Sequence, residues 1–461
     1  MVSVSKLINN GLLLVGQGAY QDLASPQQAS VEQYNIIRFL GGAAPYIQNK
    51  GFGISTDIPD QCTLEQVQLF SRHGERYPST GSGKKYKAVY EKLMSYNGTF
   101  KGELAFLNDD YEYFVPDSVY LEKETSPKNS DSIYAGTTDA MKHGIAFRTK
   151  YGELFDTNDT LPVFTSNSGR VYQTSQYFAR GFMGDDFSND TVKTNIISED
   201  ADMGANSLTP RDGCFNYNEN ANTAIVDEYT TEYLTKALNR FKASNPGLNI
   251  TEDDVSNLFG YCAYELNVKG ASPMCDIFTN EEFIQYSYSV DLDDYYSNSA
   301  GNNMTRVIGS TLLNASLELL NHDKNENKIW LSFTHDTDIE IFHSAIGILI
   351  PDEDLPVDYT PFPSPYSHVG ITPQGARTII EKYACGNESY VRYVINDAVI
   401  PIKKCSSGPG FSCNLNDYND YVAERVAGTN YVEQCGNNNA SAVTFYWDYE
   451  TTNYTASLIN S

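Results

Sequence analysis

The chain has 461 residues, of which 41% are hydrophobic and 20% charged, so it is a globular protein with ample material for a large core. It carries 32 lysines and arginines against 59 aspartates and glutamates, which gives a formal net charge of −27 and a sequence pI near 4.5. A surface this acidic argues against nucleic acid or an anionic membrane as a partner. It would also repel anionic substrates at neutral pH, so an enzyme for such substrates is expected to work best in acid.

Strand-like apolar runs are followed by polar clusters at three places in the chain. The runs are residues 62–71, 162–165 and 329–333. The clusters that follow them are, in chain order, the RHGER segment at 72–76, Arg170, and the pair His335–Asp336. Helical patterns follow the second and third runs. Strands that alternate with helices predict an α/β fold with a mixed, mostly parallel sheet, in which ligands bind at the carboxyl ends of the strands.

The remaining segments suggest how the chain divides. We expect an N-terminal arm over residues 1–50, an α/β domain from residues 51–185 and 310–461, and a mainly helical inserted domain over residues 186–309. Near the end of the chain, residues 376–384 have a helix-like pattern and residues 390–396 have a strand-like one.

Cysteines and glycosylation signals point to the secretory pathway. The eight cysteines are even in number and include no CxxC pair. Nine Asn-x-Ser/Thr sequons occur, at Asn97, Asn158, Asn189, Asn249, Asn303, Asn314, Asn387, Asn439 and Asn453. Together they indicate disulfides and a secreted glycoprotein, outside the cell or in its wall. No apolar run is long enough for a membrane-spanning helix.

The three polar clusters contain the groups that phosphoryl transfer needs. Each guanidinium of Arg72 and Arg76 can bind phosphate oxygens through two parallel hydrogen bonds, and Arg170 could supply a third such group. His73, held neutral between the arginines, could attack phosphorus as a nucleophile. His335 and Asp336 offer a donor and an acid, and a bound phosphate should raise the pKa of Asp336 by like charge. Singly, each cluster could also be a surface loop or a structural pair.

The motifs resemble those of the histidine acid phosphatases. Arg72-His73-Gly74-x-Arg76-x-Pro78 matches the RHGxRxP signature of that family, and His335-Asp336 matches its distal HD motif. The chain is similar over nearly its whole length to the branch of secreted yeast acid phosphatases and phytases.

The resemblance implies a role for each residue. His73 would form a phosphohistidine, and Asp336 would protonate the leaving group and then help to activate water. The phosphoryl oxygens would be held by Arg72, Arg76, Arg170 and His335. No metal or other cofactor is implied. The fold would combine a large α/β domain with a smaller helical one, and the disulfides would be Cys62–Cys385, Cys214–Cys435, Cys262–Cys275 and Cys405–Cys413.

Two features bear on the substrate. The lysines in Gly83-Lys84-Lys85-Tyr86 resemble a segment of filamentous-fungal phytases and could contact extra phosphates of phytate, although a solvated loop is an equal alternative. Those phytases carry a lysine pair before a Tyr-Tyr, where this chain has Asp293-Asp294. Acidic residues there would weaken a pocket for a polyanion.

These expectations converge on a secreted acid phosphomonoesterase that hydrolyses phytate and other phosphomonoesters. Three alternatives stay open: a broad acid phosphatase for which phytate is incidental, a phosphoryl transferase like the phosphoglycerate mutases, and a non-catalytic cell-wall glycoprotein. A homo-oligomer is compatible with the acidic surface and the N-terminal arm.

Overall fold

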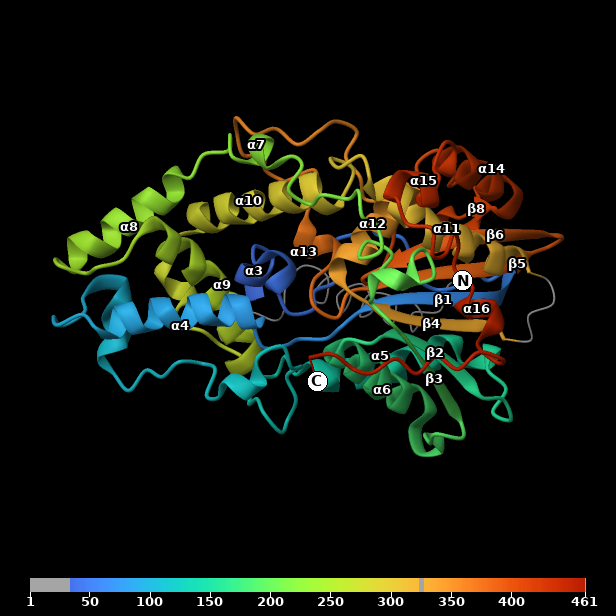
Figure 1. Ribbon diagram of the computed structural model, residues 1–461, viewed down its shortest axis with the longest axis horizontal. Helices are drawn as coiled ribbons and strands as arrows, with labels where there is room; N and C mark the ends of the chain where they lie inside the picture. Colours follow the sequence, from blue (N-terminus) through green and yellow to red (C-terminus); the bar gives the residue numbers. More distant parts are fainter. Residues whose placement is uncertain (1–33, 323–326, 461) are drawn as a thin grey trace, which may run out of the picture.

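A mixed sheet of eight strands forms the centre of one half of the molecule (Figure 1). The computed structural model describes residues 34–322 and 327–460. The strand order is β3-β2-β4-β1-β5-β6-β7, and β8 pairs with β6. The strands are β1 (Cys62–Arg72), β2 (Leu161–Ser166), β3 (Val192–Ile197), β4 (Ile329–Thr334), β5 (Arg377–Cys385), β6 (Glu388–Ile395), β7 (Ala398–Val399) and β8 (Cys413–Asn414).

The first four strands in this order are parallel, and the others pair antiparallel. In the central pair, Val67 of β1 lies opposite Ile329 of β4, and Arg72 lies opposite Thr334. Neighbouring parallel strands therefore end at the same edge of the sheet, as the sequence predicts.

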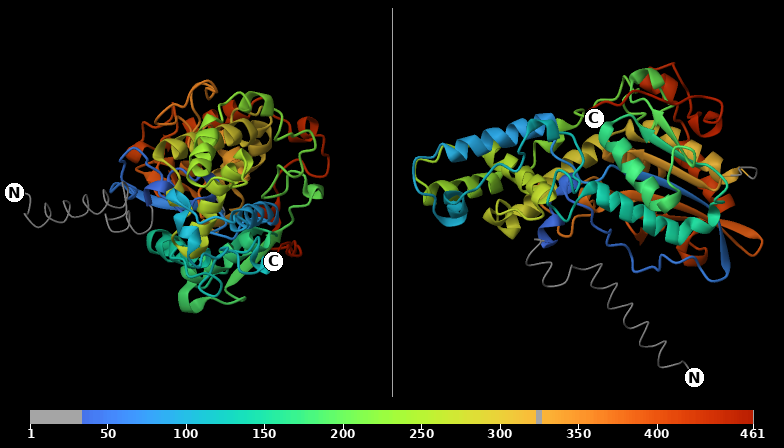
Figure 2. Two further views of the ribbon diagram at one scale, coloured as in Figure 1. Left: turned by 90° about the vertical axis from the view of Figure 1, so that its left-hand side faces the viewer. Right: turned by 90° about the horizontal axis from the view of Figure 1, so that it is seen from below.

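Helices cover both faces of the sheet, which makes a three-layer sandwich. Figure 2 shows α5 (Gly136–Tyr151) and α6 (Gly169–Met183) on one face, where Phe147 and Phe178 pack against Val163 of β2. The opposite face is covered by α11 (Thr305–Asn321), α12 (Asp336–Ile346), α14 (Leu415–Val426), α15 (Tyr431–Cys435) and α16 (Phe445–Asp448). Because both faces of the sheet are buried, the sequences of the central strands are nearly continuous apolar runs.

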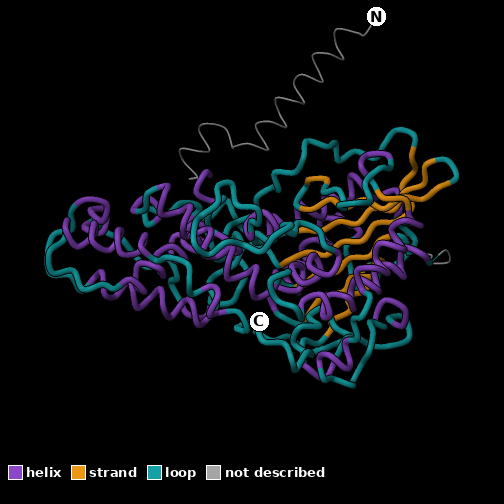
Figure 3. Tube along the Cα trace, turned by 90° about the horizontal axis from the view of Figure 1, so that it is seen from above, coloured by secondary structure: helices purple, strands orange, loops and turns teal. Residues whose placement is uncertain are grey.

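A second part, made of helices and loops, extends from one end of the sheet, so that all the strands lie in the other half of the molecule (Figure 3). Its elements are α3 (Tyr34–Ile37), α4 (Thr80–Met94), α7 (Thr223–Val226), α8 (Glu232–Ser244), α9 (Glu252–Lys269), α10 (Asn280–Asn298) and α13 (His368–Ile371). Capping boxes begin α9, at Thr251 and Asp254, and α10, at Thr279 and Glu282. The sequence predicts a helix over 230–241, and α8 is that helix.

Three segments belong to a different part of the fold from the one that the expected boundaries assign to them. β3 belongs to the sheet, although it falls in the range 186–309. α4 packs in the core of the helical part, although it falls in 51–185. Residues 37–47 of the expected arm are also in that core, through Ile37, Leu40 and Ile47, whereas residues 1–33 lie outside the described residues. Chain order alone did not reveal these placements, because each segment packs against distant parts of the chain.

The helix expected over residues 376–384 is wrong, because Arg377–Cys385 is the strand β5. It lies between β1 and β6 in the sheet. It therefore has no exposed edge and no face toward solvent, so polar and apolar residues do not simply alternate along it. The β-branched run Thr378, Ile379 and Ile380 favours a strand, and this signal outweighs the helix-like spacing.

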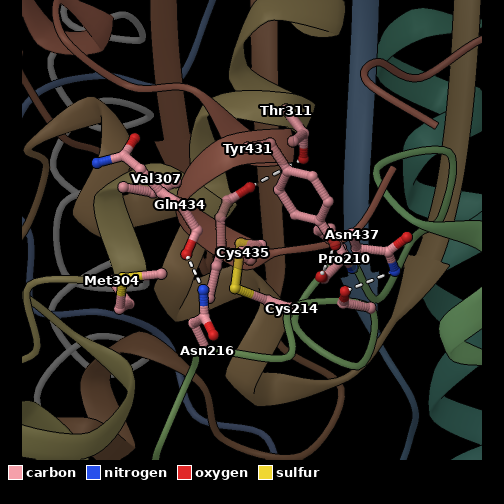
Figure 4. Close-up of a disulfide and its surroundings, with 12 residues drawn as sticks. Pro210, Cys214, Asn216, Met304, Val307, Thr311, Tyr431, Gln434, Cys435 and Asn437 are labelled. Atoms are coloured by element: carbon pink, nitrogen blue, oxygen red, sulfur yellow. Dashed lines mark hydrogen bonds between the residues drawn. A yellow bond between two sulfur atoms is a disulfide. The ribbon is translucent and has the colours of Figure 1, made fainter. Parts of the chain in front are cut away.

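The eight cysteines form four disulfides: Cys62–Cys385, Cys214–Cys435, Cys262–Cys275 and Cys405–Cys413. These are the pairs that the family resemblance implies. Figure 4 shows Cys214–Cys435, which ties the loop after β3 to α15. The Tyr431 hydroxyl donates to the Pro210 carbonyl oxygen at 2.7 Å and fastens the same loop a second time.

The glycosylation signals of the sequence lie on the surface of the protein. All nine sequon asparagines are exposed, so each is accessible for a sugar. Within residues 34–322 and 327–460, no helix combines the length and the apolar composition needed to cross a bilayer.

Candidate active site

The three polar clusters meet because β2, β4 and β1 are neighbours whose carboxyl ends share one edge. His73 follows β1, and His335 follows β4 as the residue before α12. Arg170 lies in the first turn of α6, just after β2. The rings of His73 and His335 are 5.9 Å apart and nearly edge to face. Residues from three separate parts of the sequence thus form one site.

Arg72 is held by bonds on two sides. Its Nη1 donates to the carbonyl oxygens of Gly42 and Thr372, each at 2.6 Å. Its Nη2 lies 2.7 Å from Oδ2 of Asp336. The side chain is only 2% exposed, so these partners fix the guanidinium beside His73 with little freedom to move.

His73 has the protonation state of a nucleophile. Its Nδ1 lies 2.9 Å from the Gly74 carbonyl oxygen, which can only accept, so Nδ1 carries the proton and Nε2 keeps its lone pair. Burial lowers the pKa of His73 well below its usual value, and the charges of Arg72, Arg170 and Arg76 lower it further. The imidazole is therefore neutral even in acid.

Arg76 and Arg170 complete the set of cations. Arg76 donates to the Tyr77 carbonyl oxygen at 2.9 Å, and its guanidinium lies 5.4 Å from the ring centre of Tyr264 in α9. Arg170 pairs with Glu122 at 3.0 Å; burial and the charge of Arg76 lower its pKa to about 10, so it stays charged in acid. Among the described residues, Nε of all three arginines has no hydrogen-bond partner. The cations keep donors for an anion.

The cations around Asp336 favour its ionised form. Burial alone would raise the pKa of its carboxyl group, but the charges of Arg72, His368 and His335 hold that pKa well below its usual range. The sequence expectation concerned a site with bound phosphate, whose negative charge would offset those cations. Asp336 can therefore act as an acid only after an anion has entered.

The sequence reasoning missed three carboxyl groups. Glu199, just after β3, places Oε1 2.7 Å from His335 Nε2; burial would raise the pKa of Glu199, but the hydrogen bond from His335 and its charge lower it. Glu122 pairs with Arg170. Glu124 accepts from the backbone N–H of Gly74 at 2.8 Å, and burial raises the pKa of Glu124 to about 8. Reading Val192–Ile197 as a strand would have placed Glu199 at the same sheet edge.

The residues considered for substrate selection are not gathered at the cluster. Lys84 and Lys85 are exposed on α4 rather than in a loop, and neither pairs with a described residue. Asp293 is exposed, whereas Asp294 is buried and accepts a hydrogen bond from the Tyr366 hydroxyl at 2.7 Å. Asp294 is thus turned into the protein and does not face a ligand.

The sequence and the structure both resemble known phosphatases. The family model of the histidine phosphatase superfamily (branch 2) matches residues 63–396. A phytase of Candida albicans is 61% identical over 461 residues, covering 99% of this chain and 100% of its own. A constitutive acid phosphatase of Saccharomyces cerevisiae is 43% identical over 467 residues, covering 99% and 98%.

Solved structures with the same fold are much more distant in sequence. The multiple inositol polyphosphate phosphatase of Bifidobacterium longum, in complex with phosphate, has a TM-score of 0.63 and 13% identity, covering 84% of this chain and 97% of its own. The phytase of Citrobacter braakii has a TM-score of 0.51 and 14% identity, covering 83% and 100%.

Proposed function

The chain belongs to branch 2 of the histidine phosphatase superfamily, and from that premise we propose that it is a secreted acid phosphomonoesterase acting on phytate and other phosphomonoesters. The observation that carries the proposal is the neutral, buried His73 among three arginines that retain free donors. A tetrahedral phosphoryl group matches this arrangement in charge and in hydrogen bonding. Four disulfides and nine exposed sequons support secretion as a glycoprotein.

The reaction we propose proceeds in two steps. His73 Nε2 attacks phosphorus, the bond to the ester oxygen breaks, and Asp336 gives its proton to the leaving alcohol. Water then attacks phosphorus and passes a proton to Asp336, and the bond between phosphorus and His73 Nε2 breaks. Inorganic phosphate is released, and both side chains are restored. Arg72, Arg76, Arg170 and His335 hold the phosphoryl oxygens throughout.

The acidic pH preference has two physical sources. At neutral pH the chain carries a net charge of −27, which repels an anionic ester before it reaches the site. Asp336 must also gain a proton, although the surrounding cations lower its pKa. Low pH reduces the repulsion and supplies the proton, whereas His73 stays neutral because of its burial.

Different residues favour two different substrate ranges. Exposed Lys84 and Lys85 on α4 are candidates to contact the outer phosphates of phytate, and the 61% identity to a phytase favours that substrate. The exposed carboxyl group of Asp293 favours a broad acid phosphatase instead.

The deciding experiment compares kcat/KM near pH 4.5 for phytate and for a simple aryl phosphate, with a chelator present. We expect a preference for phytate that falls in the double variant Lys84→Ala/Lys85→Ala, with Lys87→Ala on the same helix as the control. A preference for the aryl ester in the unaltered protein would make it a broad acid phosphatase. No hydrolysis of either ester would overturn the proposal.

The role of Asp336 can be tested by the leaving group. Asp336→Asn removes the proton donor, so hydrolysis of alkyl phosphates should fall by about 10²–10⁴-fold. An aryl phosphate with an acidic phenol needs little protonation, so its rate should fall far less. Equal losses for both esters would contradict proton donation by Asp336.

A further inference from the structure

A group of three buried ionisable side chains joins the helical part to the sheet next to the active site. Asp294 comes from α10, Glu340 from α12 and His368 from α13. His368 Nδ1 lies 2.9 Å from Asp294 Oδ2 and 3.2 Å from Glu340 Oε1. Figure 1 shows α12 and α13 between α10 and the sheet. One imidazole therefore lies against carboxyl groups from both parts of the molecule at their junction.

The same group contacts both residues whose carbonyl oxygens hold Arg72. The Thr372 hydroxyl donates to Glu340 Oε1 at 2.6 Å, and the Thr372 carbonyl accepts from Arg72 Nη1 at 2.6 Å. The second carbonyl belongs to Gly42, which packs directly on the His368 ring: a Cβ added at Gly42 would lie 2.1 Å from His368 Nε2. Displacement of His368 would therefore disturb both acceptors of Arg72.

Burial and the mutual interactions of the three groups shift their pKa values. Burial would lower the pKa of His368, but Asp294 and Glu340 raise it to about 10. Burial would raise the pKa of Asp294, but the charge of His368 lowers it. Burial and the charge of Asp294 keep the pKa of Glu340 well above its usual value, so Glu340 is protonated.

Other polar groups surround Asp294, Glu340 and His368. Asp291 on α10 accepts from the backbone N–H of His368 at 2.8 Å, and Tyr366 donates to Asp294. Asp293 on α10 and Asp336 on α12 also feel the charge of His368. Inside this enclosure the set holds one cation, one anion and one neutral acid, which suits a fixed brace.

We propose that Asp294, Glu340 and His368 are positioning residues that set the geometry of Arg72 and Asp336 and brace the helical part against the sheet. This inference rests on the proposed phosphatase function for its kinetic consequences only. Asp336 lies one helical turn before Glu340 on α12, and Arg72 Nη2 bonds it at 2.7 Å. The brace thus acts on the phosphate-binding arginine and the proton donor together.

The test compares His368→Gln with His343→Gln. His343 is the matched control: it is also a buried histidine, here on α12, and its Nε2 lies 2.8 Å from the Thr378 hydroxyl of β5. Among the described residues its Nδ1 has no hydrogen-bond partner. We expect His368→Gln to lower kcat and to weaken inhibition by inorganic phosphate by about tenfold to a hundredfold each. The limb of the pH–rate profile that reports Asp336 should move to higher pH, because a nearby cation is lost. His343→Gln should change stability alone.

A second variant, Thr372→Val, keeps the test valid if His368→Gln does not fold. Thr372→Val removes only the hydroxyl link to Glu340 and keeps the carbonyl that holds Arg72. It should lower kcat and weaken phosphate inhibition by about twofold to tenfold, and it should leave the pH–rate limb of Asp336 in place, because His368 keeps its charge. The proposal is wrong if both variants keep the phosphate affinity, kcat and pH profile of the unaltered protein and differ from it only in stability.

Crystal structures separate this inference from the proposed function. If the unaltered protein hydrolyses no ester, the phosphatase proposal fails, but the brace can still be judged. Loss of the bond from Arg72 Nη1 to the Thr372 carbonyl in His368→Gln, and its retention in His343→Gln, would support the brace. An unchanged Arg72 in both variants would overturn it.

Discussion

Two clusters of buried charge, one in each half of the sheet, are paired differently. In the antiparallel half, Glu381 Oε2 accepts from Arg392 Nε at 2.7 Å, and Glu381 Oε1 accepts from the Tyr151 hydroxyl at 2.7 Å and lies 2.9 Å from Lys150 Nζ. The carbonyl oxygens of Ser55 and Thr56 accept from Nη1 and Nη2 of Arg392. At the ends of the parallel strands, by contrast, Arg72, Arg76 and Arg170 each keep an unpartnered Nε among the described residues.

The difference teaches how to separate a structural cluster from a binding site. Burial by itself does not distinguish them, because Arg392 and Arg72 are each 2% exposed. A structural cluster pairs its donors within the protein, since an unpaired buried charge is costly. A binding site keeps donors for its ligand and accepts that cost when it is empty. Five substitutions test this reading, from the largest expected effect to the smallest.

The largest effect is expected for His73→Ala in the site. Without the nucleophile, kcat for phosphate esters should fall by at least about 10³-fold. Phosphate binding should persist, because the three arginines remain. Rates of phosphate release, together with calorimetric titration of inorganic phosphate, measure the two quantities separately. Full activity in this variant would disprove the role of His73.

In the structural cluster, Glu381→Gln should act on stability and not on catalysis. The neutral amide leaves Arg392 without its buried counter-charge, so unfolding free energy should fall by about 3 kcal/mol. Urea unfolding measures the change, and Lys150→Met, at a partly exposed partner, is the milder control. A selective loss of kcat with normal stability would show that the two clusters are not distinct in function.

Two carboxyl groups in the site should respond in opposite directions. Glu199→Gln removes the counter-charge of His335, so kcat/KM should fall about tenfold. Glu122→Gln frees Arg170 from its ion pair, so phosphate should bind as tightly or more tightly. Inhibition constants for inorganic phosphate at pH 4.5 compare the two. If both variants lose affinity equally, Glu199 has no special role beside His335.

The smallest effect at acid pH is expected for Glu124→Gln, which acts on the pH dependence of stability. Glu124 has a folded pKa of about 8, above its ordinary 4.5, so the folded protein binds a proton that the unfolded chain releases between these values. Its contribution is complete below pH 4.5 and is lost as pH rises through 8. The slope is at most about 1.4 kcal/mol per pH unit.

Melting temperatures at pH 5, 6, 7 and 8 measure this slope. The amide of Glu124→Gln mimics the protonated acid and keeps an acceptor for the Gly74 N–H, so stability should fall less with rising pH than in the unaltered protein. Identical slopes would mean that Glu124 is ionised in the folded state.

Local sequence was sufficient for the chemistry that lies within single loops. His73 stands between Arg72 and Arg76, and His335 precedes Asp336, whatever the rest of the chain does. The apolar runs before them had to be strands, because they are short, β-rich and bounded by polar turns. The order of strands and helices then predicted that these loops meet at one sheet edge.

Pairing between distant segments decided the rest. β5 is a strand because β1 and β6 pair with it on either side, and β3 belongs to the sheet because β2 pairs with it. Glu199 lies beside His335 only because β3 pairs with β2. The brace of Asp294, Glu340 and His368 arises from three helices that pack together, and no local pattern records which side chains such packing brings into contact. Long-range contacts depend on the free energy of the whole fold, which a pattern in one segment cannot report.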